Sequence, residues 1–197
     1  MELQSNDVLL EIGNVGTGSC MASLSHMIGE DIRYSPPELI RMEYDSFSDW
    51  FGNVGESVVG VLTPFDGDIQ GMVLQIFRDD MVRSVLEGVL GQEQGYGELD
   101  GQCLDLLREV ANIMASTYLT VLASYAGSRI TLSGAAVSMD MAGAIITELI
   151  GVSGLPEEML CIGNHFLVGT KTEDSHMMVM MQKQSARKFL EALEVAE

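Results

Sequence analysis

The chain has 197 residues, and its 29 acidic against 10 basic side chains leave a formal net charge of −19 at pH 7. This charge argues against nucleic acid and against an anionic membrane surface as partners, because no cluster of Lys and Arg is present to neutralise phosphates. A basic or mixed-charge protein partner fits better, although the acidity could also serve solubility alone.

The three cysteines predict a reducing compartment. Cys20 and Cys103 lie within apolar helical patterns, and Cys161 forms no C-x-x-C pair with either, so we expect buried free thiols. His26, His165 and His176 share no ligand spacing, so no metal site is expected. The N-terminus shows no signal-peptide pattern, and no apolar run reaches the ~18 residues that span a bilayer. We therefore expect a cytoplasmic protein without membrane insertion.

The first half of the chain predicts a helix, an extended segment, a short helix, two strands and a second helix. Gly13, Gly16 and Gly18 each weaken the first helix by roughly 1 kcal/mol relative to Ala, which close packing on one side and a partner on the other would explain. The expected elements are a helix capped at residues 5–7 and ending near 27–29, an extended segment over 32–43 broken by Ser35-Pro36-Pro37, a mixed segment over 44–56, strands over 57–63 and 71–77 joined by a turn at 65–68, and a helix capped by Asp79 or Asp80 and ending at Gly91.

The second half repeats this order after a polar, Gly-containing joint at residues 92–98. Its expected elements are a helix over 99–125 ended by Gly127, an extended segment over 129–139, a helix over 141–149, a loop over 151–155, strands over 160–170 and 176–182 around a turn at 171–174, and a last helix capped by Ser185. The Met-rich stretch 177–181 is expected in the core.

Half of this chain would leave a three-stranded sheet with an unpaired edge, which joining the halves would cover. We therefore predict a single α/β (α+β) domain over residues 1–197, built of two repeats, 1–97 and 98–197. Each repeat has the order α-β-(α)-β-β-α, and the two are related by a pseudo-twofold axis around a mainly antiparallel sheet of about six strands. Both long helices are expected on one side of this sheet.

A polar pattern, Asp-x-x-x-Glu-x-x-Asn, occurs once in each long helix, and the second Asn follows the first by 98 residues. A helix turns about 100° per residue, so the three polar residues of each copy lie within about 60° on one face. Gly18 and Ser116 extend the two stripes and would allow close approach of a partner. The rest of each helix is apolar or small and is expected to be buried: Val8, Leu9, Ile12 and Val15 in the first, and Leu106, Leu107, Val110 and Ile113 in the second. The stripes comprise Asp7, Glu11 and Asn14, and Asp105, Glu109 and Asn112.

A Glu and an Asn one turn apart cannot form a nucleophile and base, because a carboxamide does not take up a proton. A carboxamide can, however, hold a water through both its donor and its acceptor. Transfer of a phosphoryl group to water depends mainly on positioning and electrostatics, so such a pair could suffice for it. Asp7 and Asp105 could equally be first-turn acids favoured by the helix dipole.

The stripes resemble the CheC-type chemotaxis phosphatases, with the related CheX and FliY proteins. The pattern of that family is Asp/Ser-x3-Glu-x2-Asn-x22-Pro, and Pro37 stands at the required distance after Asn14. In the second half Ala135 occupies the position of the Pro, so the two sites are expected to be unequal. Two copies of the motif favour CheC over CheX.

The resemblance implies a protein phosphatase acting on phosphorylated CheY, with Asn14 and Asn112 positioning the attacking water and Glu11 and Glu109 anchoring the partner. Asp7 and Asp105 would support or cap the helices, and Pro37 would shape the neighbouring strand. The chain would need no cofactor of its own, because the Mg²⁺ belongs to CheY. CheD would be a second partner. The alternative is a non-catalytic adaptor of the same fold that binds CheY, CheD or the flagellar or archaellar motor.

Overall fold

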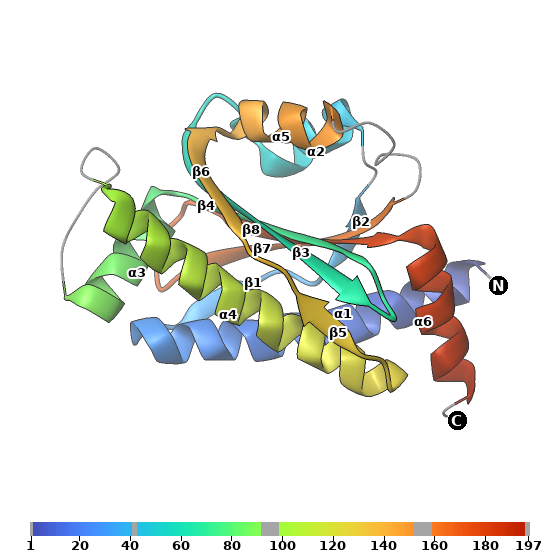
Figure 1. The fold of residues 1–197 in the computed structure, drawn as a ribbon. Coiled ribbons are helices and arrows are strands. Elements are labelled where there is room, and N and C mark those ends of the chain that lie inside the picture. The colour runs from blue at the N-terminus through green and yellow to red at the C-terminus, as the bar shows by residue number, and fades with distance from the viewer. Residues whose placement is uncertain (1, 41–42, 92–98, 152–158, 196–197) are drawn as a thin grey trace.

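The computed structural model describes residues 2–40, 43–91, 99–151 and 159–195, and Figure 1 shows their arrangement. The predicted joint at 92–98 and most of the predicted loop at 151–155 lie outside the described residues. The described elements, in chain order, are α1 (Glu2–Ile28), β1 (Ile32–Tyr34), β2 (Glu38–Ile40), α2 (Tyr44–Phe51), β3 (Ser57–Gly67), β4 (Gly71–Phe77), α3 (Asp79–Leu90), α4 (Gly101–Ala126), β5 (Ile130–Leu132), β6 (Ala136–Met141), α5 (Ala142–Gly151), β7 (Met159–Val168), β8 (Ser175–Gln182) and α6 (Lys183–Val195).

The eight strands form one curled antiparallel sheet in the order β1-β7-β8-β4-β3-β5. Each edge consists of two short strands, because β2 also pairs with β7 and β6 also pairs with β3. On one edge the break falls at Ser35-Pro36-Pro37, where two consecutive prolines cannot donate to the ladder. The sheet therefore has six strand positions, and the predicted α+β fold is confirmed.

A pseudo-twofold axis relates the halves and passes between β4 and β8 at the centre of the sheet, where Leu74 pairs with Met178. Equivalent backbone hydrogen bonds also form at the two edges of the sheet. The Ser35 amide donates to the His165 carbonyl oxygen at 2.9 Å, and the Ser133 amide donates to the Pro64 carbonyl oxygen at 2.8 Å. Positions in β7 can therefore be matched to positions in β3, which allows the two candidate sites to be compared residue by residue.

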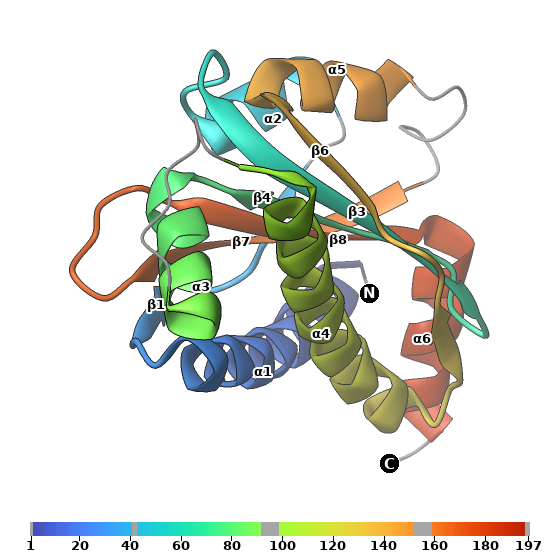
Figure 2. The same ribbon diagram turned by 60° about the vertical axis from the view of Figure 1, so that its left-hand side comes forward.

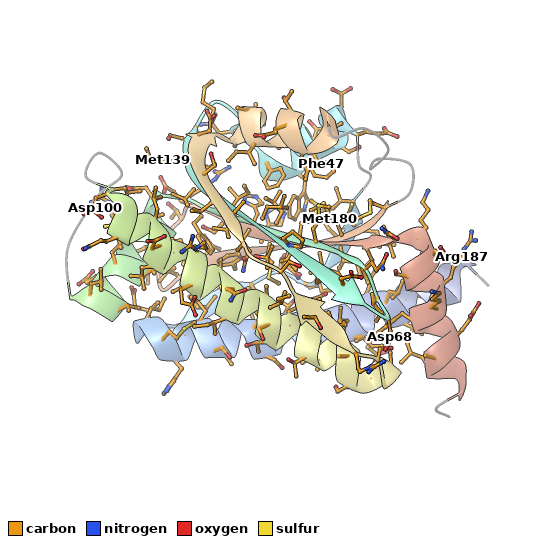
Figure 3. The ribbon with its side chains drawn as sticks, in the orientation of Figure 1. Phe47, Asp68, Asp100, Met139, Met180 and Arg187 are labelled. Atoms are coloured by element: carbon orange, nitrogen blue, oxygen red, sulfur yellow. The ribbon has the colours of Figure 1, made fainter. Side chains whose placement is uncertain are left out.

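Two helical layers cover the two faces of the sheet (Figures 1 and 2). Helices α1, α3, α4 and α6 cover one face and enclose the larger hydrophobic core. Helices α2 and α5 cover the other face over a smaller core that includes Phe47 of α2 and Met180 of β8, both labelled in Figure 3. Residues Met177–Met181 are all buried, as expected for core methionines. The two long helices lie on one face, as predicted.

Several predicted helix caps are wrong. Helix α1 begins at Glu2, so Ser5, Asn6 and Asp7 lie inside it, since nothing in this polar stretch opposes helical dihedrals. Helix α4 is instead capped by Asp100, whose carboxylate accepts from the amides of Gln102 and Cys103, both at 2.9 Å.

The caps predicted for α3 and α6 also differ. Arg78 occupies the N-cap position of α3, and Asp79 and Asp80 belong to its first turn, where the helix dipole favours them. Ser185 lies inside α6, and its hydroxyl accepts from the Gln70 amide at 3.0 Å. The Ser185 hydroxyl therefore makes a tertiary contact with the residue before β4 in place of the predicted helix cap.

The turn predicted at residues 65–68 is also displaced. Strand β3 continues to Gly67 because Phe65, Asp66 and Gly67 pair with Leu132, Thr131 and Ile130 of β5. An Asp-Gly pair favours a turn locally, but here both residues pair with a strand from the other half of the chain, with Gly67 at a φ of +122°.

Candidate functional site

Both polar stripes face outward from the large helical layer. Asp7, Glu11 and Asn14 are exposed on α1, and Gly18 is partly exposed. On α4, Asp105, Glu109 and Ser116 are exposed, and Asn112 is half-buried. Both carboxamides can therefore be reached by a partner. Helices α1 and α4 pack against each other on the same face of the sheet (Figure 2), so the stripes belong to neighbouring elements.

The two aspartates at the start of the stripes do not cap their helices. Asp7 lies beyond the first turn of α1, and Asp105 lies beyond the first turn of α4. Asp105 forms an exposed ion pair with Arg108, with 2.9 Å between Oδ1 and Nη2. Such i,i+3 pairs contribute a few tenths of a kcal/mol at most. The capping and first-turn interpretations of Asp7 and Asp105 are therefore wrong, and their role in supporting the helices stays a prediction.

The glycines of α1 make room for an aromatic ring from α4. A Cβ on Gly16 would lie 3.0 Å from Cδ2 and Cε2 of Tyr118, and a Cβ on Gly13 would lie 3.1 Å from its hydroxyl oxygen. Tyr118 is fully buried. The expected close packing on one side of the first helix is thus present, and it joins the two motif-bearing helices directly.

Two residues of the β1–β2 edge flank the first stripe. The Cγ of Pro37 lies 3.8 Å from the position of a Cβ on Gly13, so the proline packs beside the turn that carries Asn14. The hydroxyl oxygen of Tyr34 lies 3.1 Å from the position of a Cβ on Gly18. The small residue at the end of the first stripe therefore admits a tyrosine from this chain, although close approach by a partner was expected there.

The end of the second stripe is open instead. A surface groove of about 600 Å³ runs between α4 and β5 and includes Ser116, Thr120, Arg129 and Leu132 in its lining. Leu132 is the last residue of β5, and Tyr34 is the last residue of the matching strand β1. The leucine side chain is shorter than the tyrosine side chain and leaves the groove unfilled. The two sites therefore differ in shape as well as in the Pro37 and Ala135 positions.

A buried polar bridge fastens α1 to the sheet beneath the first stripe. The Thr17 hydroxyl lies 2.8 Å from Oδ1 of Asn164 and 2.9 Å from the Gly13 carbonyl oxygen, and can donate to either. The Nδ2 of Asn164 donates to the Ser35 carbonyl oxygen at 3.0 Å. The Ser35 hydroxyl in turn accepts from the His165 amide at 3.1 Å. The turn of α1 that carries Asn14, strand β7 and the segment before Pro37 are thus connected.

Three apolar residues beside the stripes are exposed, which the sequence interpretation missed. Val8, Val15 and Ile113 have 39%, 42% and 38% of their surface exposed, although all three were expected to be buried. Val15 and Ile113 each follow the motif Asn directly. Recurrence of an apolar residue in both copies does not distinguish them, because Leu9 and Leu107 recur in the same register and are buried. The sequence therefore carried no signal that separates these exposed residues from the buried ones.

The buried polar and thiol groups do not offer nucleophilic chemistry. All three cysteines are free and buried, as expected, and burial raises the pKa of the Cys161 thiol to about 12. Burial likewise raises the pKa of Cys20 and of Tyr118. In the described residues, no group of three or more His, Cys, Asp or Glu side chains could hold a metal ion. Among the described helices, none is long and apolar enough to cross a bilayer.

The chain is similar in sequence to known proteins. Residues 5–41, which contain Glu11, Asn14 and Pro37, match the CheC-like family. The chain is 26% identical over 194 residues to "CheY-P phosphatase CheC" of Bacillus subtilis (strain 168), a match that covers 95% of this chain and 92% of that protein. The resemblance to the CheC-like family is therefore confirmed.

Solved structures of CheC-like and related proteins share this fold. FliY of Thermotoga maritima superposes with a TM-score of 0.72 at 20% identity over 98% of each chain. CheX from Desulfovibrio desulfuricans superposes with a TM-score of 0.57 at 15% identity, over 87% of this chain and 99% of that one. At 20% and 15% identity these structures show that the fold is shared. The distant homology to CheC is a similarity of sequence as well.

Proposed function

We propose that the protein is a phosphatase that dephosphorylates the chemotaxis response regulator CheY, with a site on each long helix. The observation that carries the proposal is the pair of Asp-x-x-x-Glu-x-x-Asn stripes, both accessible to solvent and on neighbouring helices. The distant homology to a CheY-P phosphatase supports the same reading. Residues 1–97 and 98–197 would act as two repeats of one domain, each supplying one stripe.

Asn14 and Asn112 are the candidate water-positioning residues. Each carboxamide would enter the active site of the phosphorylated partner and hold a water through one donor and one acceptor. The water oxygen would form a new bond to phosphorus, and the bond from phosphorus to the aspartate oxygen would break. The partner's aspartate would leave as a carboxylate, and both water protons would leave with inorganic phosphate as dihydrogen phosphate. Positioning is sufficient for a large effect, because alignment of a nucleophile removes much of the entropic part of a barrier.

Glu11 and Glu109 are the candidate anchoring residues. Each lies one turn before its Asn on the exposed stripe, where it can pair with a cationic side chain of the partner. Val15 and Ile113 add exposed apolar surface beside each Asn, and apolar contact surrounded by polar residues is typical of a protein interface. Mg²⁺, supplied by the partner, would neutralise charge on the phosphoryl group.

The remaining assignments follow from the family and stay proposals. Pro37 would shape the first site through its contact beside Gly13. CheD would be a second partner, and the cytoplasm would be the compartment.

The decisive experiment measures loss of labelled phosphate from phosphorylated CheY with wild type, Asn14→Ala, Asn112→Ala and the double variant. The double variant is expected to lose acceleration, while each single variant keeps the activity of one site. Asn53→Ala, which removes an exposed asparagine distant from both motifs in sequence, is the matched control and should behave as wild type. Unchanged dephosphorylation in the double variant would contradict the proposal, and partner binding without accelerated phosphate release would favour the adaptor.

A further inference from the structure

The bridge between Thr17 and Asn164 lies inside the protein, away from any partner. Thr17 is fully buried and Asn164 is 1% exposed. The amide of Asn164 is oriented by its neighbours, because its Nδ2 donates to the Ser35 carbonyl oxygen and its Oδ1 therefore faces the Thr17 hydroxyl. A carboxamide buried in this way persists only when its donors and acceptors find partners.

The second half lacks the equivalent bridge. The Pro64 carbonyl oxygen on β3 accepts from Ser133. The His165 carbonyl oxygen on β7 accepts from Ser35 in the same way. Thr63, which precedes Pro64, therefore occupies the position that Asn164 occupies before His165. The position on α4 that matches Thr17 is Ala115, 98 residues later. Thr63 has a buried hydroxyl that makes no hydrogen bond to the described residues. The same fold therefore forms with and without this bridge.

Two connections link the bridge to the turn that carries Asn14. It ties the turn Gly13–Thr17 to strand β7, which restrains sliding and rotation of α1 at the turn that carries Asn14. It also ties β7 to Ser35, which places Pro37 against Gly13. An Asn that must align a water needs its backbone held within roughly 0.5 Å, and buried hydrogen bonds beneath a site supply such restraint.

We propose that Thr17 and Asn164 are positioning residues that hold Asn14 in its productive geometry, and that the second site works without such a pair. This inference rests on the phosphatase function proposed above. Neither residue touches the partner, so their effect should fall on the rate of the bound complex and not on binding. Loss of the bridge is expected to lower kcat of the first site about tenfold with little change in KM.

The test isolates one site at a time. Thr17→Val removes the hydroxyl at nearly constant volume, and Thr17→Ser keeps it. Each is placed in an Asn112→Ala background, which leaves the first site active, and in an Asn14→Ala background, which leaves the second. Asn164→Thr, which installs the residue that β3 carries at the matching position, is measured in both backgrounds. The readouts are kcat and KM for loss of labelled phosphate from phosphorylated CheY.

In the first-site background, Thr17→Val and Asn164→Thr should lower kcat, and Thr17→Ser should retain it. In the second-site background all three should leave kcat unchanged, which also shows that the variants are folded. Unchanged kcat in the first-site background, or an equal fall in both backgrounds, would overturn the inference. The proposed function itself is wrong if wild type and both single variants, Asn14→Ala and Asn112→Ala, all fail to accelerate phosphate loss.

Discussion

The ring of Tyr118 on α4 lies directly against Gly16 on α1, so closely that a Cβ on the glycine would come within 3.0 Å of two ring carbons. Gly16→Ala should therefore lower the free energy of unfolding by about 1–2 kcal/mol, since overpacking outweighs the roughly 1 kcal/mol gained in helix propensity. Gly101→Ala is the matched control, because a Cβ there would meet nothing within 4 Å. Urea unfolding of the two variants measures the difference, and equal stability would show that the helices can separate without cost.

The hydroxyl of Tyr118 is buried and has no hydrogen-bond partner in the described residues. A buried polar atom without a partner costs free energy, so its removal should not destabilise the protein. Tyr118→Phe is expected to keep or raise the free energy of unfolding by up to about 1 kcal/mol. Thermal and urea unfolding test this expectation, and a loss of more than about 1 kcal/mol would reveal a partner for the hydroxyl.

The free energy of unfolding is expected to depend on pH because His176 is buried. Its burial, and then the neighbouring His165 and Arg78, lower its pKa to about 2. The unfolded chain binds a proton at this side chain below pH 6.5 and the folded chain does not, so stability falls as the pH drops from 6.5 towards 2. The limiting slope is about 1.4 kcal/mol per pH unit.

Urea unfolding between pH 7.5 and 5.5 measures this slope before most carboxylates titrate. His176→Met, which fills irregular core space without an ionisable group, should flatten the curve in this range. His26→Gln is the control at an exposed histidine and should leave the curve as in wild type. An unchanged slope in the His176 variant would show that another group carries the dependence.

The two sites should contribute unequally. Asn14 follows Gly13, beside which Pro37 packs, and lies on the turn held by the Thr17–Asn164 bridge. Asn112 is half-buried, and Ala135 stands in the position of the proline. Asn14→Ala is therefore expected to remove the larger share of phosphatase activity, by at least about threefold over Asn112→Ala. Single-turnover loss of labelled phosphate compares the two variants, and equal losses would contradict the expectation.

The exposed apolar residues beside the stripes should contribute to partner binding. Val15→Asn and Ile113→Asn are each expected to raise KM for phosphorylated CheY about three- to tenfold, because buried apolar contacts at an interface are lost. Stability should change little, since both side chains are already exposed. Val89→Asn on α3, where the valine is 42% exposed, is the matched control and should leave KM unaltered.

Periodicity and spacing were enough to predict the long helices, the core methionines of β8 and the repeat of both halves. Each of these depends on which side chains recur along a single element, which is local information. The two Asn-bearing stripes were predicted for the same reason, and the structure leaves both accessible.

Other features depended on contacts between distant parts of the chain. Ser185 has the sequence pattern of a helix cap but accepts from Gln70, and the Asp-Gly pair predicted in a turn instead pairs with β5. Val15 and Ile113 have the composition of a core face, and only the packing of α1 against α4 leaves them outside. A sequence pattern cannot show which side of an apolar helix its neighbours will cover.

The sequence by itself thus determined which residues share a helical face, because backbone geometry sets that relationship within a few turns. The tertiary structure decided which faces are covered and which groups meet, as when Asn164 reaches Thr17 across 147 positions of the chain. That contact depends on the register of β7 beneath α1, and register is a property of the assembled sheet and not of any single segment.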